Sequence, residues 1–156
     1  MSRADTKIPY VNLKNQWRDE RADLLPLIDS VLESGQYIGG DQLETFEDNI
    51  AKFCGVNYAS ALNSGTDALT FALMLSGVKK NDEVITPPNS FIASTASIVH
   101  VGAKPVFVDV LPDQNLDPSK IEDAITKNTK AIMPVHLTGR VCDMDPIMDI
   151  AKKYNL

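Results

Sequence analysis

Residues 63–67 read Asn-Ser-Gly-Thr-Asp and combine groups that suit the binding of an anion. They follow an apolar run at residues 58–62 that is typical of a short strand, and they open an amphipathic stretch that is typical of a helix. A helix N-terminus presents unpaired backbone N–H groups and the positive end of the helix dipole, so it favours a phosphate. Gly65 permits close backbone approach, Thr66 adds a hydroxyl donor, and Asp67 lies in the first helical turn. We therefore predict an anion site at this turn.

The elements that must position this turn alternate along the chain. The pattern predicts strands at 58–62, 83–86, 105–110 and 130–135, followed respectively by helices at 66–76, 91–101, 118–126 and 145–154. Two earlier helices are expected at 12–34 and 41–54, with Gly35 and Gly55 as their stops. This succession predicts an α/β fold with a mostly parallel sheet flanked by helices. Ligands of such sheets bind at the carboxyl ends of the strands, which here are residues 63–67, 87–91, 109–113 and 136–140.

Composition and charge exclude several classes of function. The formal net charge is −6 and the basic residues do not cluster, which argues against nucleic acid as the main partner. No apolar stretch approaches the roughly 20 residues of a membrane-spanning helix, and the first residues lead into no signal region, so we expect a cytoplasmic protein. Cys54 and Cys142, even with His100 and His136, offer no ligand pair with usable local spacing, and we expect no metal site.

Six segments together resemble a known family. They lie at residues 8–14, 34–40, 63–69, 82–87, 102–110 and 134–139, and they include Asn-Ser-Gly-Thr-Asp-Ala-Leu and Pro-Val-His-Leu-Thr-Gly. Each segment is weak evidence alone, but their order and spacing match throughout nearly the whole chain. The chain resembles the DegT/DnrJ/StrS-type sugar aminotransferases, which are pyridoxal-phosphate (PLP) enzymes. The resemblance implies part of the large domain of the aspartate-aminotransferase fold, also called fold type I.

The resemblance implies which residues bind the cofactor. The turn formed by Gly65, Thr66 and Asp67 would hold the phosphate of PLP, and Phe91 would place its ring against the pyridine face. The strand-end rule agrees, because both positions follow predicted strands at the same edge of the sheet. Stacking of this kind requires an aromatic side chain.

Substrate contacts are implied less directly. Tyr10 and Tyr37 lie in segments that border the substrate in this family. His136 ends the fourth predicted strand at the ligand edge, where both a substrate-facing role and a structural role are open.

The chemistry of the family also needs a lysine that forms a Schiff base with PLP and a carboxylate that pairs with the pyridinium nitrogen. The resemblance places both after the segment present here, so we assign no catalytic residue. The lysines considered as substitutes are predicted at the amino ends of strands or on the last helix: Lys79, Lys80, Lys104, Lys127, Lys130, Lys152 and Lys153. We therefore expect residues 1–156 to form an N-terminal segment and an incomplete PLP-binding large domain, without the C-terminal part of the fold.

Three hypotheses about function follow. The first is the N-terminal fragment of an aminotransferase that aminates a nucleotide-linked keto-sugar with a donor such as glutamate; the complete enzyme would be a homodimer, and the fragment alone inactive. The second is a truncated, non-catalytic protein that binds or dimerises. The third is a PLP-dependent sugar dehydratase of the same family. A nicotinamide-binding domain is disfavoured, because none of the eight glycines forms a Gly-x-Gly-x-x-Gly motif.

Overall fold

The computed structural model describes residues 8–156, which divide into two compact units, one that ends at Ala61 and one that spans Leu62–Leu156. The first unit holds helix α1 (Leu13–Ser34) and helix α2 (Asp41–Cys54). The side chain of Asn12 caps α1 by accepting a hydrogen bond from the Asn15 N–H. Both helices end, as predicted, at glycines in the left-handed conformation, Gly35 and Gly55.

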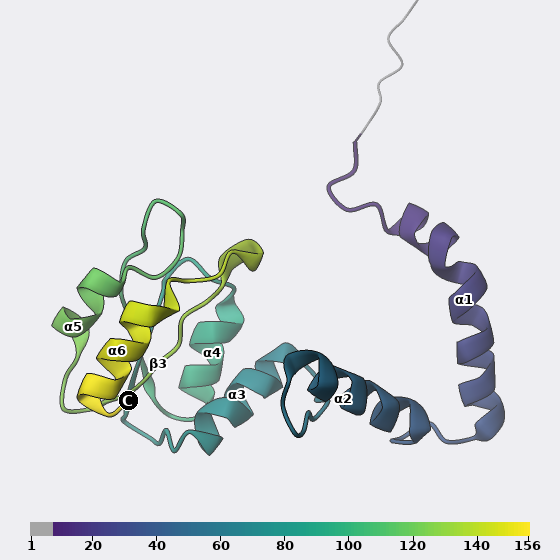
Figure 1. The fold of residues 1–156 in the computed structure, drawn as a ribbon, viewed down its shortest axis with the longest axis horizontal. Helices are drawn as coiled ribbons and strands as arrows, with labels where there is room; N and C mark the ends of the chain where they lie inside the picture. Colours follow the sequence, from purple (N-terminus) through teal and green to yellow (C-terminus); the bar gives the residue numbers. More distant parts are fainter. Residues whose placement is uncertain (1–7) are drawn as a thin grey trace, which may run out of the picture. The chain divides into compact units, whose positions relative to one another are not determined.

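The second unit carries the sheet (Figure 1). Its elements are α3 (Gly65–Leu75), β1 (Glu83–Thr86), α4 (Ile92–His100), β2 (Lys104–Phe107), α5 (Ile121–Ala124), β3 (Thr129–Ile132) and α6 (Met144–Tyr154), with short 3-10 turns at Pro118–Lys120 and Leu137–Gly139. The strands are parallel and their order is β2-β1-β3. The predicted α/β class, with a parallel sheet flanked by helices, is confirmed.

Alternation along β1 divides the core into two layers. Val84 belongs to a buried cluster with Leu73 of α3 and Ile98 of α4. Its neighbour Ile85 faces the opposite way, because successive side chains of a strand point to opposite faces. Ile85 belongs to a second cluster, with Ile121 of α5 and with Ile147 and Ile150 of α6. Helices α3 and α4 therefore cover one face of the sheet, and α5 and α6 cover the other.

One predicted strand is wrong. Residues 58–62 form no strand, and the side chain of Tyr58 is largely exposed. A strand requires a neighbouring backbone with which it can pair, and the three-stranded sheet of the described residues does not include this run. The Ala61 N–H instead donates to the Glu47 carboxylate, at 2.7 Å from Oε1.

The other elements differ from the predictions mainly at their ends. The strand predicted at 105–110 stops at Phe107, and Val110 instead pairs in antiparallel fashion with Leu116. The helix predicted at 118–126 is a 3-10 turn followed by the short α5. Asp117 caps that turn, with its carboxylate accepting a hydrogen bond from the Ser119 N–H.

The core arrangement predicts which substitutions destabilise the fold. Ile85 is 0% exposed in the core layer that it shares with α5 and α6, so we expect Ile85→Ala to lower the free energy of unfolding by about 2–5 kcal/mol. Leu75, which is 89% exposed, provides a control, and Leu75→Ala should change stability by less than about 0.5 kcal/mol. Urea denaturation of both variants checks this expectation, and equal losses would contradict the layered core.

Candidate functional site at the strand ends

The first turn of α3 has two free backbone donors. The Ser64 side chain caps the helix by accepting a hydrogen bond from the Asp67 N–H at 3.1 Å, and the Ser64 carbonyl accepts from the Ala68 N–H. Within the described part of the chain, the N–H groups of Gly65 and Thr66 have no acceptor. The sequence pattern predicted this helix N-terminus, but it did not predict that Ser64 occupies the Asp67 amide.

Gly65 leaves space beside these donors. Apart from the adjoining residues and the backbone of α3 itself, no heavy atom of the described chain lies within 4 Å of the position that a Cβ would take, and the backbone φ is not in the left-handed region. Neither intrachain packing nor backbone conformation therefore requires glycine at this position. The Asp67 carboxylate accepts a hydrogen bond from the Asn63 amide at 3.3 Å, which helps to shape the turn before the helix.

Phe91 lies at the start of α4, the helix that packs against α3. The two helices pack against each other, and residues near their ends, Leu73 and Ile98, share one core cluster. Phe91 is the N-cap residue of α4, five residues beyond the end of β1, and its side chain is 77% exposed. The ring is thus free to contact a ligand.

His136 lies in the segment after β3, and its ring makes a hydrogen bond within the loop. Its Nδ1 accepts from the Cys142 N–H at 3.0 Å. A nitrogen that accepts a hydrogen bond carries no proton, so the neutral ring is protonated at Nε2. The residue as a whole is exposed. A structural contact is therefore present, while the substrate-facing role stays a prediction.

Cys142 is buried next to this loop. Its thiol donates to the Val135 carbonyl at 3.2 Å, and burial raises the pKa of the Cys142 thiol above its usual value. The other cysteine, Cys54, is exposed. No cluster of three or more candidate metal ligands occurs among residues 8–156.

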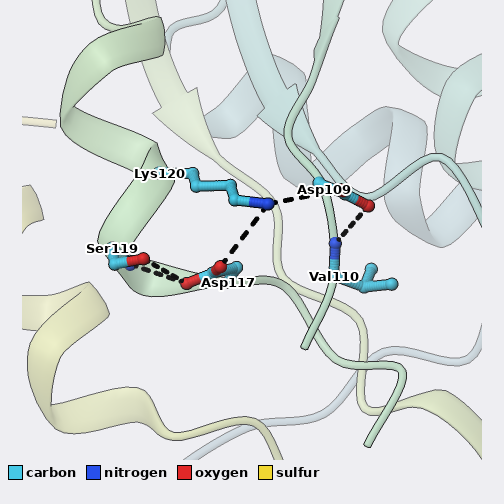
Figure 2. A network of polar contacts seen from close by, with 5 residues as sticks. All are labelled: Asp109, Val110, Asp117, Ser119 and Lys120. Carbon is cyan, nitrogen blue, oxygen red and sulfur yellow. Dashed lines mark hydrogen bonds and ion pairs between the residues drawn. The ribbon is translucent and has the colours of Figure 1, made fainter. Parts of the chain in front are cut away.

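A polar network fixes the segment after β2 (Figure 2). Lys120 lies between two carboxylates, with Nζ 3.2 Å from Asp109 Oδ2 and 3.8 Å from Asp117 Oδ2. The Asp109 carboxylate also accepts from the Val110 N–H at 2.9 Å. The Val110 N–H and then Lys120 lower the pKa of Asp109 from its usual value.

The positions of the lysines agree in most cases with the sequence analysis. Lys79 and Lys80 precede β1, and Lys127 precedes β3, so these three lie at the amino ends of strands. Lys120 was not considered from the sequence, although it contacts Asp109 just beyond the carboxyl end of β2. Pro118 and Asp117, which start the 3-10 turn containing Lys120, were the sequence signals that could have identified it.

Two predicted site residues belong to the first unit. Tyr10 and Tyr37 are both exposed, and the Tyr37 hydroxyl donates to the Leu32 carbonyl at 3.2 Å. Their roles in substrate contact stay predictions.

None of the described helices is long and apolar enough to cross a membrane.

Comparison with known proteins supports a relationship over most of the chain. Residues 18–156 match the model of the DegT/DnrJ/EryC1/StrS aminotransferase family. The dTDP-3-amino-3,6-dideoxy-alpha-D-galactopyranose transaminase of Aneurinibacillus thermoaerophilus is 44% identical over 96% of this chain and 41% of its own length. The dTDP-3-amino-3,4,6-trideoxy-alpha-D-glucose transaminase of Streptomyces venezuelae is 41% identical over 99% of this chain and 41% of its own length.

Solved structures show the same fold. NtdA from Bacillus subtilis, with bound cofactor PMP, has a TM-score of 0.94 and 39% identity, covering 99% of this chain and 36% of that one. DesV from S. venezuelae has a TM-score of 0.92 and 40% identity, covering 96% and 41% of the two chains. These are fold type I PLP aminotransferases, so the predicted fold is confirmed. The chain spans about two fifths of the length of these curated relatives.

The Lys120 network predicts a measurable titration. Because the lysine lowers the pKa of Asp109, Lys120→Met should raise that pKa toward its usual value, while the Val110 N–H keeps part of the shift. A lowered folded-state pKa contributes stability above the unfolded-state pKa, and this contribution is lost as the pH falls through the folded-state pKa. Carboxyl-carbon NMR across acidic pH measures the change. Lys127→Met is the control, and an unmoved Asp109 pKa in Lys120→Met would refute the contact.

Proposed function

The chain belongs to the DegT/DnrJ/EryC1/StrS aminotransferase family, and from this premise we propose that it is the amino-terminal part of a PLP-dependent sugar aminotransferase. The complete enzyme would transfer an amino group from a donor such as glutamate to a keto-sugar linked to a nucleotide. The observation that carries the proposal is the first turn of α3. There the N–H groups of Gly65 and Thr66 have no acceptor in the described chain, and packing within the chain does not require a glycine at residue 65.

The phosphate of PLP fits the groups present at this turn. The N–H groups of Gly65 and Thr66 are donors without partners in the described chain, and the helix dipole favours a negative charge at this end. A side chain at residue 65 would occupy the space through which a phosphate approaches the backbone. Thr66 would add its hydroxyl, and Asp67 would support the turn through Asn63.

Phe91 would contact the pyridine ring of the same cofactor. Its side chain is exposed at the start of α4, and α4 packs on α3. Flat aromatic surfaces stack with a gain of about 0.5–1.5 kcal/mol beyond that of burial. Bound PLP supplies an electron sink for reaction at the amino-bearing carbon, whereas the residues of this chain bind and orient it.

The names of two relatives support the proposal that the complete enzyme recognises a nucleotide-linked sugar. Both are named as transaminases of dTDP-linked amino sugars, and they align with nearly the whole of this chain. Tyr10, Tyr37 and His136 are the proposed substrate contacts. We further propose a homodimer and a cytoplasmic location for the complete protein.

A substitution at the phosphate turn tests cofactor binding. In the complete enzyme, Thr66→Ala removes a hydroxyl that would donate to the phosphate, so the Kd for PLP should rise roughly tenfold. The matched control is Thr70→Ala, one turn later in α3, because the Thr70 hydroxyl donates to the Thr66 carbonyl within the helix. Absorbance titration with PLP measures both Kd values, and an unchanged value for Thr66→Ala would refute the phosphate assignment.

The lysines of this chain should not form a specific covalent link to PLP. Lys79, Lys80 and Lys127 precede strands, and Lys120 is engaged by two carboxylates, so none of these four lysines is free at the proposed cofactor ring. Incubation with PLP, borohydride reduction and peptide mapping should give only weak, scattered labelling. One lysine labelled to full stoichiometry would contradict this expectation.

A further inference from the structure

Three loops at the carboxyl edge of the sheet are connected by two asparagine side chains. The Asn89 amide, after β1, donates to the Gln114 carbonyl in the segment after β2 at 3.0 Å. The next residue, Asn115, reaches the segment after β3. Its Nδ2 donates to the carbonyls of Arg140 and Val141, both at 3.2 Å. These bonds span 25 or 26 positions in the sequence, so they hold separate parts of the chain together.

Asn115 uses its whole amide in this role. Its Oδ1 accepts from the Leu137 N–H at 3.3 Å, in addition to the two bonds that Nδ2 donates, and the same N–H also donates to the Val135 carbonyl at 2.9 Å. The residue is only 1% exposed, so an unpaired group here would stay without water. Aspartate has the same shape but places a second acceptor against two carbonyl oxygens. The site therefore requires an amide rather than only a polar side chain.

The backbone on both sides of these contacts is in an unfavourable conformation. Gln114 has φ 74° and Thr138 has φ 54°, although neither residue is glycine. The left-handed region is uncommon for such residues, above all for a β-branched threonine. Such conformations persist where surrounding bonds determine them, and Asn115 supplies bonds next to both positions.

The loop that Asn115 holds carries His136. Leu137, whose N–H donates to Asn115, is the next residue, and Cys142, whose N–H donates to His136 Nδ1, follows directly after Val141. The loop is thus fixed at both ends by Asn115, and its closure leaves the His136 proton on Nε2. This nitrogen is a donor, suited to an oxygen of a ligand.

We propose that Asn115 is a positioning residue: by fixing the loop after β3, it holds His136 so that Nε2–H donates a hydrogen bond to an oxygen of the ligand bound at the strand ends. This inference rests on the proposed function, because the ligand is the PLP and nucleotide-sugar pair of that function. Asn115 acts through His136 and does not itself touch the ligand.

The loop is tested first, without ligand. Long-range ¹H–¹⁵N NMR of the chain should show His136 with its proton on Nε2, and hydrogen exchange should show protected Leu137 and Cys142 amides. Asn115→Asp should speed exchange of both amides by roughly tenfold or more and mix the two ring tautomers. Asn128→Asp, at an exposed asparagine before β3, is the matched control and should change neither. A proton on Nδ1, or unprotected amides in the unaltered chain, would overturn the proposal even if Asn115→Asp fails to fold.

The ligand is tested next, with PLP and dTDP-glucose as probes. In the unaltered chain, saturating probes should shift the His136 Nε2 resonance together with the Gly65 and Thr66 amides, and Asn115→Asp should weaken the Nε2 shift while the amides still respond. Shifted amides with an unmoved Nε2 would overturn the donor role and leave the proposed function intact. If neither responds, this chain does not bind the two probes, and the ligand role proposed for His136 in this chain fails.

Discussion

The central strand β1 is the constraint on which the second unit depends. Its four residues pair with a parallel strand on each side, and Val84 and Ile85 are wholly buried in opposite layers. This short strand therefore contributes a wholly buried side chain to each of the two apolar clusters. Thr86, at its end, donates from its hydroxyl to the Met133 carbonyl at 3.0 Å and accepts at its own carbonyl from the Val108 N–H. These two hydrogen bonds align the carboxyl ends of the three strands. The loops proposed to bind the ligand follow directly after these ends.

Features that depend on neighbouring residues were predictable from the sequence. The bounds 83–86 of the central strand, the glycine ends of α1 and α2, and the Asp117 cap all follow from local pattern or local hydrogen bonding. The same reasoning correctly predicted a helix N-terminus near Gly65. The family resemblance then connected that turn with a cofactor, which local pattern alone does not do.

Features that depend on distant partners were not predictable in this way. The apolar run at 58–62 has the composition of a strand, but a strand also needs a neighbouring backbone, and the sequence pattern does not contain that information. The contacts of Asn115 were missed for a related reason, since its partners lie 22 to 26 residues away. Asparagine before Leu-Asp-Pro resembles ordinary loop composition until the structure shows the residue buried and fully bonded.

Helix α1, in the first unit, is stabilised differently from the helices that pack on the sheet of the second unit. None of its 22 residues is buried, so its helicity rests on backbone hydrogen bonds, the Asn12 cap and the left-handed Gly35. Helices stabilised in this way follow helix–coil statistics, in which nucleation is unfavourable and the ends fray. Pro26 adds to this, because it removes one backbone donor from the middle of the helix. The melting of α1 alone would accordingly be gradual with temperature, like that of an isolated peptide, and would lack the sharp transition of a packed core.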